Sequence, residues 1–237
     1  MKEVIIVKES FKREEIKYLL NEEMYNKVMN ELSNYLVKDE YYESKILNIY
    51  YDTPNYDLLI KSIDKPIYKE KVRLRSYKVP SLKDNVFLEV KKKYKGVVSK
   101  RRVVCTLNEF YNYYNKKEMI KKSKMKELDY LFKHYDLEPK IFIGYDRLSY
   151  KLKDDNEVRI TFDTNIRSRT SDLSLEMGDA GNLYFKEKTY IMEIKALDSL
   201  PLYVTKLLNE NKIYPVSFSK VGAVYKKMKG SELCLTA

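Results

Sequence analysis

The chain has 237 residues, with 46 Lys and Arg against 35 Asp and Glu, and a formal net charge of +11. Its hydrophobic content of 44% supports a folded core, and six Gly and six Pro are too few for a low-complexity chain. Two cysteines argue against a disulfide framework, and a single histidine excludes a histidine-ligated zinc site. The positive surplus predicts an anionic partner: phosphates, nucleic acid or an acidic membrane surface.

No linker, repeat or low-complexity stretch divides the chain, so we expect one domain over residues 1–237. The apolar run at residues 4–7 lies between charged residues and is too short for a signal segment or a membrane span. We therefore expect a cytoplasmic protein without a membrane span.

The predicted elements, in chain order, follow an α+β pattern. A strand at residues 11–20 ends at Asn21, which is predicted to cap a helix over residues 22–36. A strand at 45–51 and a short helix after Pro54 come next. The remaining strands are expected at 68–77, 86–93, 97–105, 140–152, 157–167 and 183–195, and the remaining helices at 108–115, at 117–135, after Pro201 and after Ser219.

Alternate side chains of a strand point to opposite faces of the sheet, and the polar face of these strands is strongly basic. In the strand at 68–77, for example, Lys71, Arg73 and Arg75 share one face, opposite Val72 and Leu74. The bases on the polar faces, together with one lysine that follows Ser219, are Arg13, Lys17, Lys71, Arg73, Arg75, Lys91, Lys100, Arg102, Arg147, Arg159, Lys195 and Lys220. The acids on the same faces are Glu15, Glu89, Asp163 and Glu193.

An ordinary solvated sheet face mixes charges of both signs, because like charges opposite one another are destabilising. The excess of bases therefore favours a face that holds a polyanion. We predict that the sheet closes into an eight-stranded antiparallel β-barrel with this face inside and the helices packed outside. The interior would be a positively charged tunnel, and its carboxylates could hold a divalent cation that bridges phosphates.

An ordered set of motifs resembles one family, the VTC polyphosphate polymerase domain of the triphosphate tunnel metalloenzyme (CYTH-like) superfamily. The motifs are Phe11–Tyr18, Tyr50–Thr53, Lys71–Arg75, Glu89–Lys91, Lys100–Arg102, Tyr145–Arg147, Val158–Asp163, Glu193–Lys195 and Ser217–Lys220. The superfamily opens with an ExExK pattern, and the matching positions here are Arg13, Glu15 and Lys17. The arginine in place of the first glutamate is similar to the VTC branch. Fungal relatives carry a further sensing domain and membrane helices, and neither occurs in this sequence.

The resemblance implies synthesis of inorganic polyphosphate from ATP, with release of ADP, aided by Mn²⁺ or Mg²⁺. Its implied catalytic residues are Lys17, Arg73, Arg75, Lys91, Arg147 and Arg159. The implied substrate-binding residues are Arg13, Lys71, Lys100, Arg102, Tyr145, Lys195, Ser219 and Lys220. Glu193 is the expected metal ligand, with Glu89 as an ion-pair partner or a second carboxylate, and a metal role for Glu15 stays open.

Three other functions stay open at this point. The tunnel could hydrolyse tripolyphosphate or a nucleoside triphosphate, or bind polyphosphate without catalysis. A nucleic-acid binder is disfavoured because no RNP1 pattern, helix-turn-helix or zinc-finger spacing occurs. We therefore expect ATP and polyphosphate as partners and no nucleic acid. Product length, oligomeric state and a membrane or other protein partner are not fixed by these residues.

Overall fold

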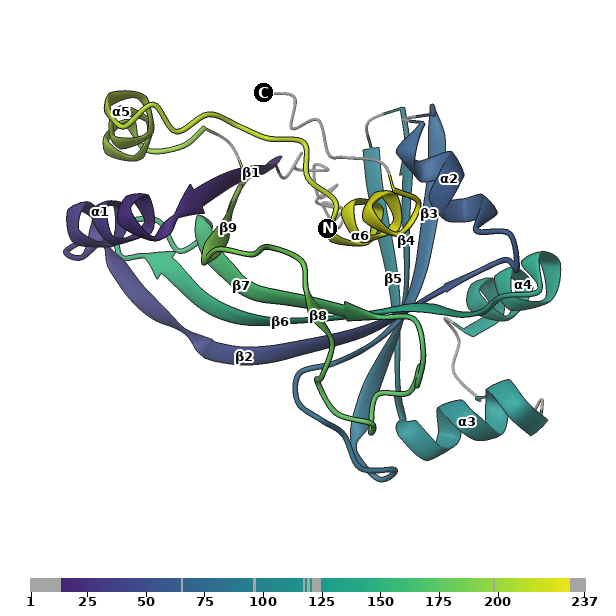
Figure 1. Ribbon diagram of the computed structural model, residues 1–237. Helices are drawn as coiled ribbons and strands as arrows, with labels where there is room; N and C mark the ends of the chain where they lie inside the picture. The colour runs from purple at the N-terminus through teal and green to yellow at the C-terminus, as the bar shows by residue number, and fades with distance from the viewer. Residues whose placement is uncertain are drawn as a thin grey trace, which may run out of the picture.

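The fold is one antiparallel sheet with helices on both of its faces (Figure 1). The computed structural model describes residues 14–64, 66–95, 97–116, 118, 120, 125–197 and 199–230. The strands are β1 (Glu14–Asn21), β2 (Leu36–Asp52), β3 (Tyr68–Ser76), β4 (Asn85–Tyr94), β5 (Val97–Thr106), β6 (Glu138–Leu152), β7 (Arg159–Arg169), β8 (Asn182–Leu183) and β9 (Thr189–Ala196). The helices are α1 (Glu22–Leu32), α2 (Asp57–Ile63), α3 (Leu107–Lys116), α4 (Met125–Tyr135), α5 (Leu202–Glu210) and α6 (Lys220–Met228).

The strands run in the order β1-β9-β7-β6-β2-β3-β4-β5, and the short strand β8 pairs with β7. The long strands β2 and β6 pair with each other at the centre of this order, and their register shifts between Lys38 and Glu43 and again between Tyr50 and Tyr51. Such irregularities bend a sheet and increase its twist. The two halves of the sheet, β1-β9-β7 and β3-β4-β5, are therefore turned toward each other across β2 and β6.

Asn21 joins the first strand to the first helix without a linker. It pairs with Thr189 as the last residue of β1, and its side-chain Oδ1 accepts a hydrogen bond from the Met24 amide at 2.8 Å. This is the predicted cap, and Glu22 and Glu23 in the first turn complement the positive end of the helix dipole.

Several predicted elements have different bounds in the structure, and the strand predicted at 45–51 runs over Leu36–Asp52 as β2. Helix α1 ends at Leu32, not at residue 36, because Ser33 and Asn34 favour a turn, and the Tyr35 amide bonds to the Leu32 carbonyl at 2.8 Å. The single strand predicted at 183–195 is divided into β8 and β9 by residues 184–188. The helix predicted over 117–135 is described as a helix only from Met125, because much of 117–124 lies outside the described residues.

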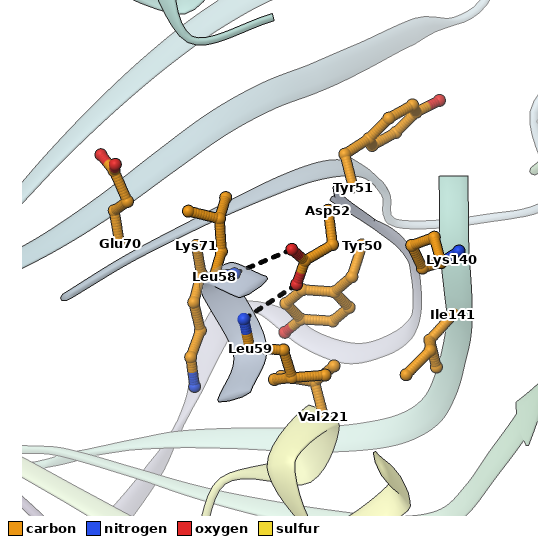
Figure 2. A pocket seen from close by; sticks show the side chains of 10 residues that line it. All are labelled: Tyr50, Tyr51, Asp52, Leu58, Leu59, Glu70, Lys71, Lys140, Ile141 and Val221. Atoms are coloured by element: carbon orange, nitrogen blue, oxygen red, sulfur yellow. Dashed lines mark hydrogen bonds between the residues drawn. The ribbon is translucent and has the colours of Figure 1, made fainter. Parts of the chain in front are cut away.

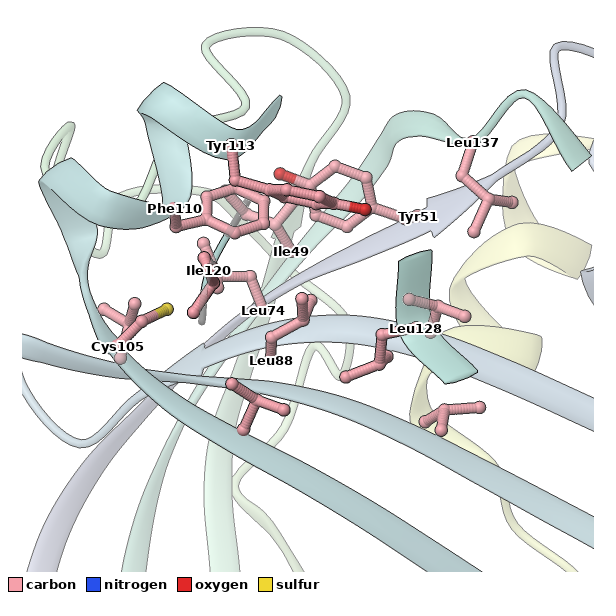
Figure 3. Close-up of a cluster of buried hydrophobic side chains, with 14 of the residues drawn as sticks. Ile49, Tyr51, Leu74, Leu88, Cys105, Phe110, Tyr113, Ile120, Leu128 and Leu137 are labelled. Atoms are coloured by element: carbon pink, nitrogen blue, oxygen red, sulfur yellow. The ribbon is translucent and has the colours of Figure 1, made fainter. Parts of the chain in front are cut away.

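Apolar side chains fill the face of the sheet that lies opposite the charged one. Helices α3 and α4 cover the β2-β3-β4-β5 half, where Phe110 and Leu128 pack over Ile49, Leu74 and Leu88 (Figure 3). Helices α1 and α5 cover the β1-β9-β7 half in the same way. Because both apolar surfaces are covered, the charged face is the one that the two halves of the sheet turn toward each other.

Helix α6 differs from the other helices because it packs on the same face as the charged side chains. Val221 and Val224 pack in one cluster with Ile141 and Ile143 of β6 and with Ile191 of β9. Residues two positions apart on a strand share a face, and two positions after Ile191 lies the charged Glu193. The prediction that all helices pack outside is therefore wrong for α6. One part of the inner face is charged, and the adjoining part is apolar and filled by this helix.

The predicted closed barrel of eight strands is also wrong: in the described part of the chain the sheet has nine strands and stays open. Within the described residues, β1 pairs only with β9 and β5 only with β4, so the two ends of the strand order do not bond to each other. Side chains nevertheless meet across the gap, since Lys91 Nζ of β4 lies 3.9 Å from Glu15 Oε2 of β1. Alternation of residues specifies the polar face but not the stagger and tilt on which closure depends.

We expect Phe110→Ala to lower the free energy of unfolding by about 3–5 kcal/mol, because this fully buried ring packs against Tyr51 and Tyr114 and its removal leaves a cavity. Urea denaturation gives the measurement. Leu202→Ala, at a side chain that is 83% exposed, is the control and should change stability by less than about 0.5 kcal/mol. Equal losses in the two variants would contradict the assignment of this core.

Candidate functional site

The strand register places the predicted site residues on one face. In the β3-β4-β5 half, Lys71 pairs with Lys91, Arg73 with Glu89, and Glu89 with Arg102. In the other half, Glu193 of β9 lies between Lys17 of β1 and Thr161 of β7, and Lys195 lies between Glu15 and Arg159. Charged residues far apart in the sequence therefore form continuous rows across neighbouring strands.

Glu89 is the centre of the charge cluster on the β3-β4-β5 half, and it is 1% exposed. Its carboxylate accepts hydrogen bonds from Arg73 Nε at 2.8 Å and Arg102 Nε at 2.6 Å, and Lys100 Nζ lies 2.6 Å away. Burial by itself raises the pKa of Glu89, but the charges of Arg73, Arg75 and Lys100 outweigh it and lower the pKa to about 2. The carboxylate therefore stays ionised and fixes the three bases that surround it.

Asp163 has the same role on the opposite half and is fully buried. Arg147 binds it with both nitrogens of its fork, Nε at 2.6 Å and Nη2 at 2.8 Å, and Lys220 Nζ lies 2.6 Å from Oδ2. Burial opposes ionisation, yet the two cations hold the pKa of Asp163 below its ordinary value. This contact also ties the start of α6 to β7.

Glu15 and Glu193 form the third acidic centre, and they share two lysines. Lys17 forms an ion pair with Glu15 and lies 3.5 Å from Glu193, while Lys195 lies 2.6 Å from Glu193 and 3.9 Å from Glu15. Burial opposes charge on Glu193, but Lys195 and Lys17 lower its pKa, and Glu193 with Glu15 raises the pKa of Lys17. Glu15, Glu193 and Lys17 therefore carry their full charge near pH 7.

Tyr50 and Asn48 of β2 hold the guanidinium groups of β3. Arg75 Nε donates to Asn48 Oδ1 at 2.8 Å, its Nη2 donates to the Tyr145 hydroxyl at 3.2 Å, and Arg73 Nη1 donates to the Tyr50 hydroxyl at 3.2 Å. Burial raises the pKa of Tyr50, but Arg73, Arg75 and a neighbouring lysine reverse this and bring it to about 8. The guanidinium groups are thus oriented before any ligand arrives.

Ser219 links Lys71 to the N-terminus of α6. The Ser219 hydroxyl accepts a hydrogen bond from Lys71 Nζ at 2.9 Å and another from the Gly222 amide at 3.3 Å, which confirms the predicted cap. Burial, with the nearby charges of Lys69 and Lys91, lowers the pKa of Lys71 to about 8. The positive end of the helix and two lysines, Lys71 and Lys220, therefore face the same space.

Arg159 lies at the rim of the charged face. Its Nη2 lies 2.7 Å from Asp39 Oδ2, and its Nε donates to the Ser149 hydroxyl at 3.0 Å. Lys151 also pairs with Asp39, at 3.2 Å. Arg159 thus belongs to the same face but is paired with a carboxylate that the sequence analysis did not identify.

The predicted site residues therefore lie together, with one exception: Arg13 lies outside the described residues. Sequence reasoning missed Asn48, Tyr50, Asp39 and Ser149, which orient the arginines. The first two could have been found, because polar residues at alternate positions of the strand predicted at 45–51 share a face. Asp39 could not, since the register irregularity of β2 breaks the alternation beside it.

A small pocket adjoins this face, and Tyr50 and Lys71 are among the residues that line it. Asp52, which lines the pocket, accepts hydrogen bonds from the Leu58 and Leu59 amides at 2.9 Å each and so caps α2 (Figure 2). In the same view Tyr50 and Lys71 point one way and Glu70 the other, as the alternation requires. The carboxylate of Asp52 is used structurally.

Only part of the charged face suits a metal ion. No cluster of three or more His, Cys, Asp and Glu occurs in the described part of the chain. Glu15 and Glu193, which share Lys17 and Lys195, supply two adjacent carboxylates. Mg²⁺ and ions of its kind are commonly held by one or two carboxylates together with substrate phosphates, so this pair fits. Glu89 does not, because three bases already surround it.

The sequence and the fold were compared with known proteins. The VTC domain family matches residues 12–229, which is most of the chain. This chain belongs to the VTC domain family. The family resemblance expected from the motifs is therefore confirmed. A search among curated proteins finds no match.

Two solved structures share the fold of this VTC domain protein. A candidate adenylate cyclase from Bacillus halodurans matches with a TM-score of 0.55 and 13% identity, over 87% of this chain and 95% of that chain. A candidate adenylate cyclase from Vibrio parahaemolyticus matches with a TM-score of 0.51 and 11% identity, over 90% and 97%. At such identities the likeness concerns the fold alone. None of the helices in the described ranges is long and apolar enough to cross a membrane.

We expect Glu89→Gln to destabilise the protein by roughly 3 kcal/mol at pH 7, because it removes the buried counter-charge of Lys100 and of the half-buried Arg73 and Arg102. The lowered pKa of Glu89 stabilises the wild type above pH 4.5, and this contribution is lost as the pH falls toward about 2. Urea denaturation across this range gives the measurement.

Glu210→Gln is the matched control, since Glu210 is 60% exposed and pairs only weakly with Lys206 at 3.7 Å. It should cost less than about 1 kcal/mol at any pH. If Glu89→Gln were as mild as this control, the view that Glu89 organises its cluster would be wrong.

We expect the affinity of this face for a polyanion, with long-chain polyphosphate as the probe, to fall by roughly tenfold between pH 7 and pH 9. The reason is that Lys71 loses its positive charge and Tyr50 gains a negative one as the pH passes about 8. Titration calorimetry at constant ionic strength measures the change. In the Lys71→Arg/Tyr50→Phe double variant most of the dependence should disappear, and a fall as steep as in the wild type would refute this origin.

Proposed function

We propose that this protein is a polyphosphate polymerase, which transfers the γ-phosphoryl group of ATP to phosphate or to the end of a growing polyphosphate chain. One observation carries the proposal: the inner face collects guanidinium and ammonium groups from both halves of the sheet and holds them in place with buried carboxylates. Phosphoryl transfer requires alignment and charge neutralisation more than covalent participation by the protein. Membership of the VTC domain family supports the same activity.

In the proposed reaction, a terminal oxygen of the acceptor forms a bond to the γ-phosphorus of ATP. The bond from that phosphorus to the β–γ bridging oxygen breaks, ADP leaves with the electron pair, and the chain is one phosphate longer. Negative charge builds up on the transferred group and on the leaving oxygen. Fixed cations around these oxygens lower the barrier without reorganising during the step.

The two halves of the sheet supply different parts of this site. Arg73 and Arg75, oriented by Tyr50, Asn48 and Tyr145, present forked donors suited to phosphate oxygens. Lys17 of the opposite half and Arg147 of the central strand β6 face the same space, and Lys91 reaches across to Glu15. The other proposed catalytic residue is Arg159, and the proposed substrate-binding residues are Arg13, Lys71, Lys100, Arg102, Tyr145, Lys195, Ser219 and Lys220.

Glu193, with Glu15 beside it, is proposed to hold Mn²⁺ or Mg²⁺ together with phosphate oxygens of the substrate. Such an ion, when bound, neutralises phosphate charge and orients the nucleotide. Lys17 and Lys195, which pair with Glu193, lie beside this position and are proposed to contact the phosphate oxygens.

The proposal is tested by incubating the protein with ATP and Mn²⁺ and separating the products on a gel that resolves polyphosphate chains. We expect a ladder of products, and we expect Lys17→Ala and Glu193→Gln each to reduce its formation by about 100-fold or more. Lys27→Ala, at an exposed lysine of α1, removes the same charge and should leave the rate unchanged.

Other outcomes of this assay would overturn the proposal. Release of free phosphate without a ladder would identify a hydrolase, and tight polyphosphate binding without turnover would identify a binding module. Salt-sensitive binding of an oligonucleotide that polyphosphate fails to displace would indicate a nucleic-acid binder.

A further inference from the structure

Large apolar side chains are exposed together where β3 begins and the β4–β5 hairpin ends. They are Ile67 before β3, Tyr94 at the end of β4, and Val97 and Val98 at the start of β5, and each is 50–73% exposed. Tyr94 pairs with Val97, and the Ile67 carbonyl accepts a hydrogen bond from the Lys95 amide at 3.0 Å. These side chains, called the hairpin end below, are therefore neighbours. Exposed apolar groups that cluster in this way mark a binding surface.

The hairpin end presents apolar groups on both faces of the sheet. Lys93 and Val98 pair with each other on the charged face, in line with Lys100. Tyr94 and Val97 come one residue nearer to the turn, so they lie on the other face. A protein partner packed against one face would leave the apolar groups of the other face in water. A lipid surface that the hairpin enters end-on would cover both.

The charges of the hairpin are all of one sign. Residues 91–102 include no Asp or Glu, and their seven bases are Lys91, Lys92, Lys93, Lys95, Lys100, Arg101 and Arg102. Two of these bases, Lys93 and Lys95, are exposed beside the apolar group, and Lys95 Nζ lies 5.5 Å from the centroid of the Tyr94 ring. A lysine has an apolar stem and a charged tip, so it can lie along apolar surface while its ammonium group reaches an anion.

We propose that the hairpin end binds the surface of a membrane that contains anionic lipids. Ile67, Tyr94 and Val97 enter the headgroup region, and Lys93 and Lys95 contact the lipid phosphates. Aliphatic side chains gain free energy by leaving water, tyrosine is favoured at the level of the headgroups, and lysines are attracted to an anionic leaflet. Such binding is reversible and requires no membrane-spanning element.

The test measures cosedimentation with vesicles of phosphatidylcholine and phosphatidylserine in equal parts. We expect the wild type to bind these mixed vesicles and to bind vesicles of phosphatidylcholine alone far more weakly. Val97→Ser/Val98→Ser leaves every charge in place and should weaken binding to the mixed vesicles by about tenfold. Lys93→Gln/Lys95→Gln should weaken it by about as much.

Leu82→Ser/Leu202→Ser is the matched control, since it removes two other exposed apolar side chains. It should bind the mixed vesicles as the wild type does. All of these substitutions are at exposed positions, so the variants are expected to fold.

A second measurement locates the contact. The sequence contains no tryptophan, so Val97→Trp introduces a single fluorescent reporter. Its emission should shift to shorter wavelength on addition of mixed vesicles, and brominated lipid should quench it. The emission of Leu202→Trp should change in neither way.

Three results would overturn the proposal. The first is a wild type that binds neither kind of vesicle. The second is a Val97→Ser/Val98→Ser variant that binds mixed vesicles as tightly as the wild type, because the attraction would then come from the net positive charge alone. The third is quenching at Leu202→Trp without quenching at Val97→Trp, which would place the lipid contact elsewhere.

Discussion

The structure depends on one constraint: many basic side chains are enclosed together on the face that the two halves of the sheet turn toward each other. Antiparallel sheets commonly bury one apolar face and expose the other to water. Here the apolar face is covered by α1, α3, α4 and α5, and the polar face is turned inward by the bend of β2 and β6. Basic side chains brought so close together are tolerable only because Glu89, Asp163 and Glu193 lie among them, each in contact with at least two bases.

Under the proposed function, these ion pairs decide how a polyanion binds. Arginines and lysines held by buried carboxylates have already lost much of their hydration and side-chain freedom, so a phosphate ligand meets them in place. In binding, phosphate oxygens then take the place of protein carboxylates as partners of the bases, or they accept hydrogen bonds from N–H groups of the bases that the carboxylates leave unused. An arginine such as Arg73, which contacts both Glu89 and Tyr50, has its fork oriented before the exchange.

Sequence periodicity predicted the composition of the charged face well and its three-dimensional form less well. A period of two places Arg73 and Glu89 on the same face whatever the sheet does at its edges, and the cross-strand pairing agrees. The same period says nothing about whether β1 meets β5. Nor did it predict the face on which α6 packs, because Val221 and Val224 show the same spacing whichever face of the sheet the helix covers.

The residues that orient the arginines of the site differ in the same way: the sequence pattern predicts some of them and not others. Tyr50 lies in a regular strand, where alternation reveals its face. Asp39 lies next to a register irregularity, and its pairing with Arg159 depends on the tertiary bend. Local pattern therefore predicts the side chains that regular strands present, while partners introduced by bends and insertions require the structure.

Asn21 has a consequence for the accuracy of the site. A slip of one residue in the pairing of β1 with β9 would turn Lys17 from the charged face to the apolar face and replace it with Ile16 or Tyr18. Because Asn21 is both the last paired residue of β1 and the cap of α1, such a slip would also pull the first turn of the helix apart. The buried packing of Val28 and Leu32 fixes α1, and through Asn21 it holds Lys17 in register, although Lys17 lies more than ten residues away.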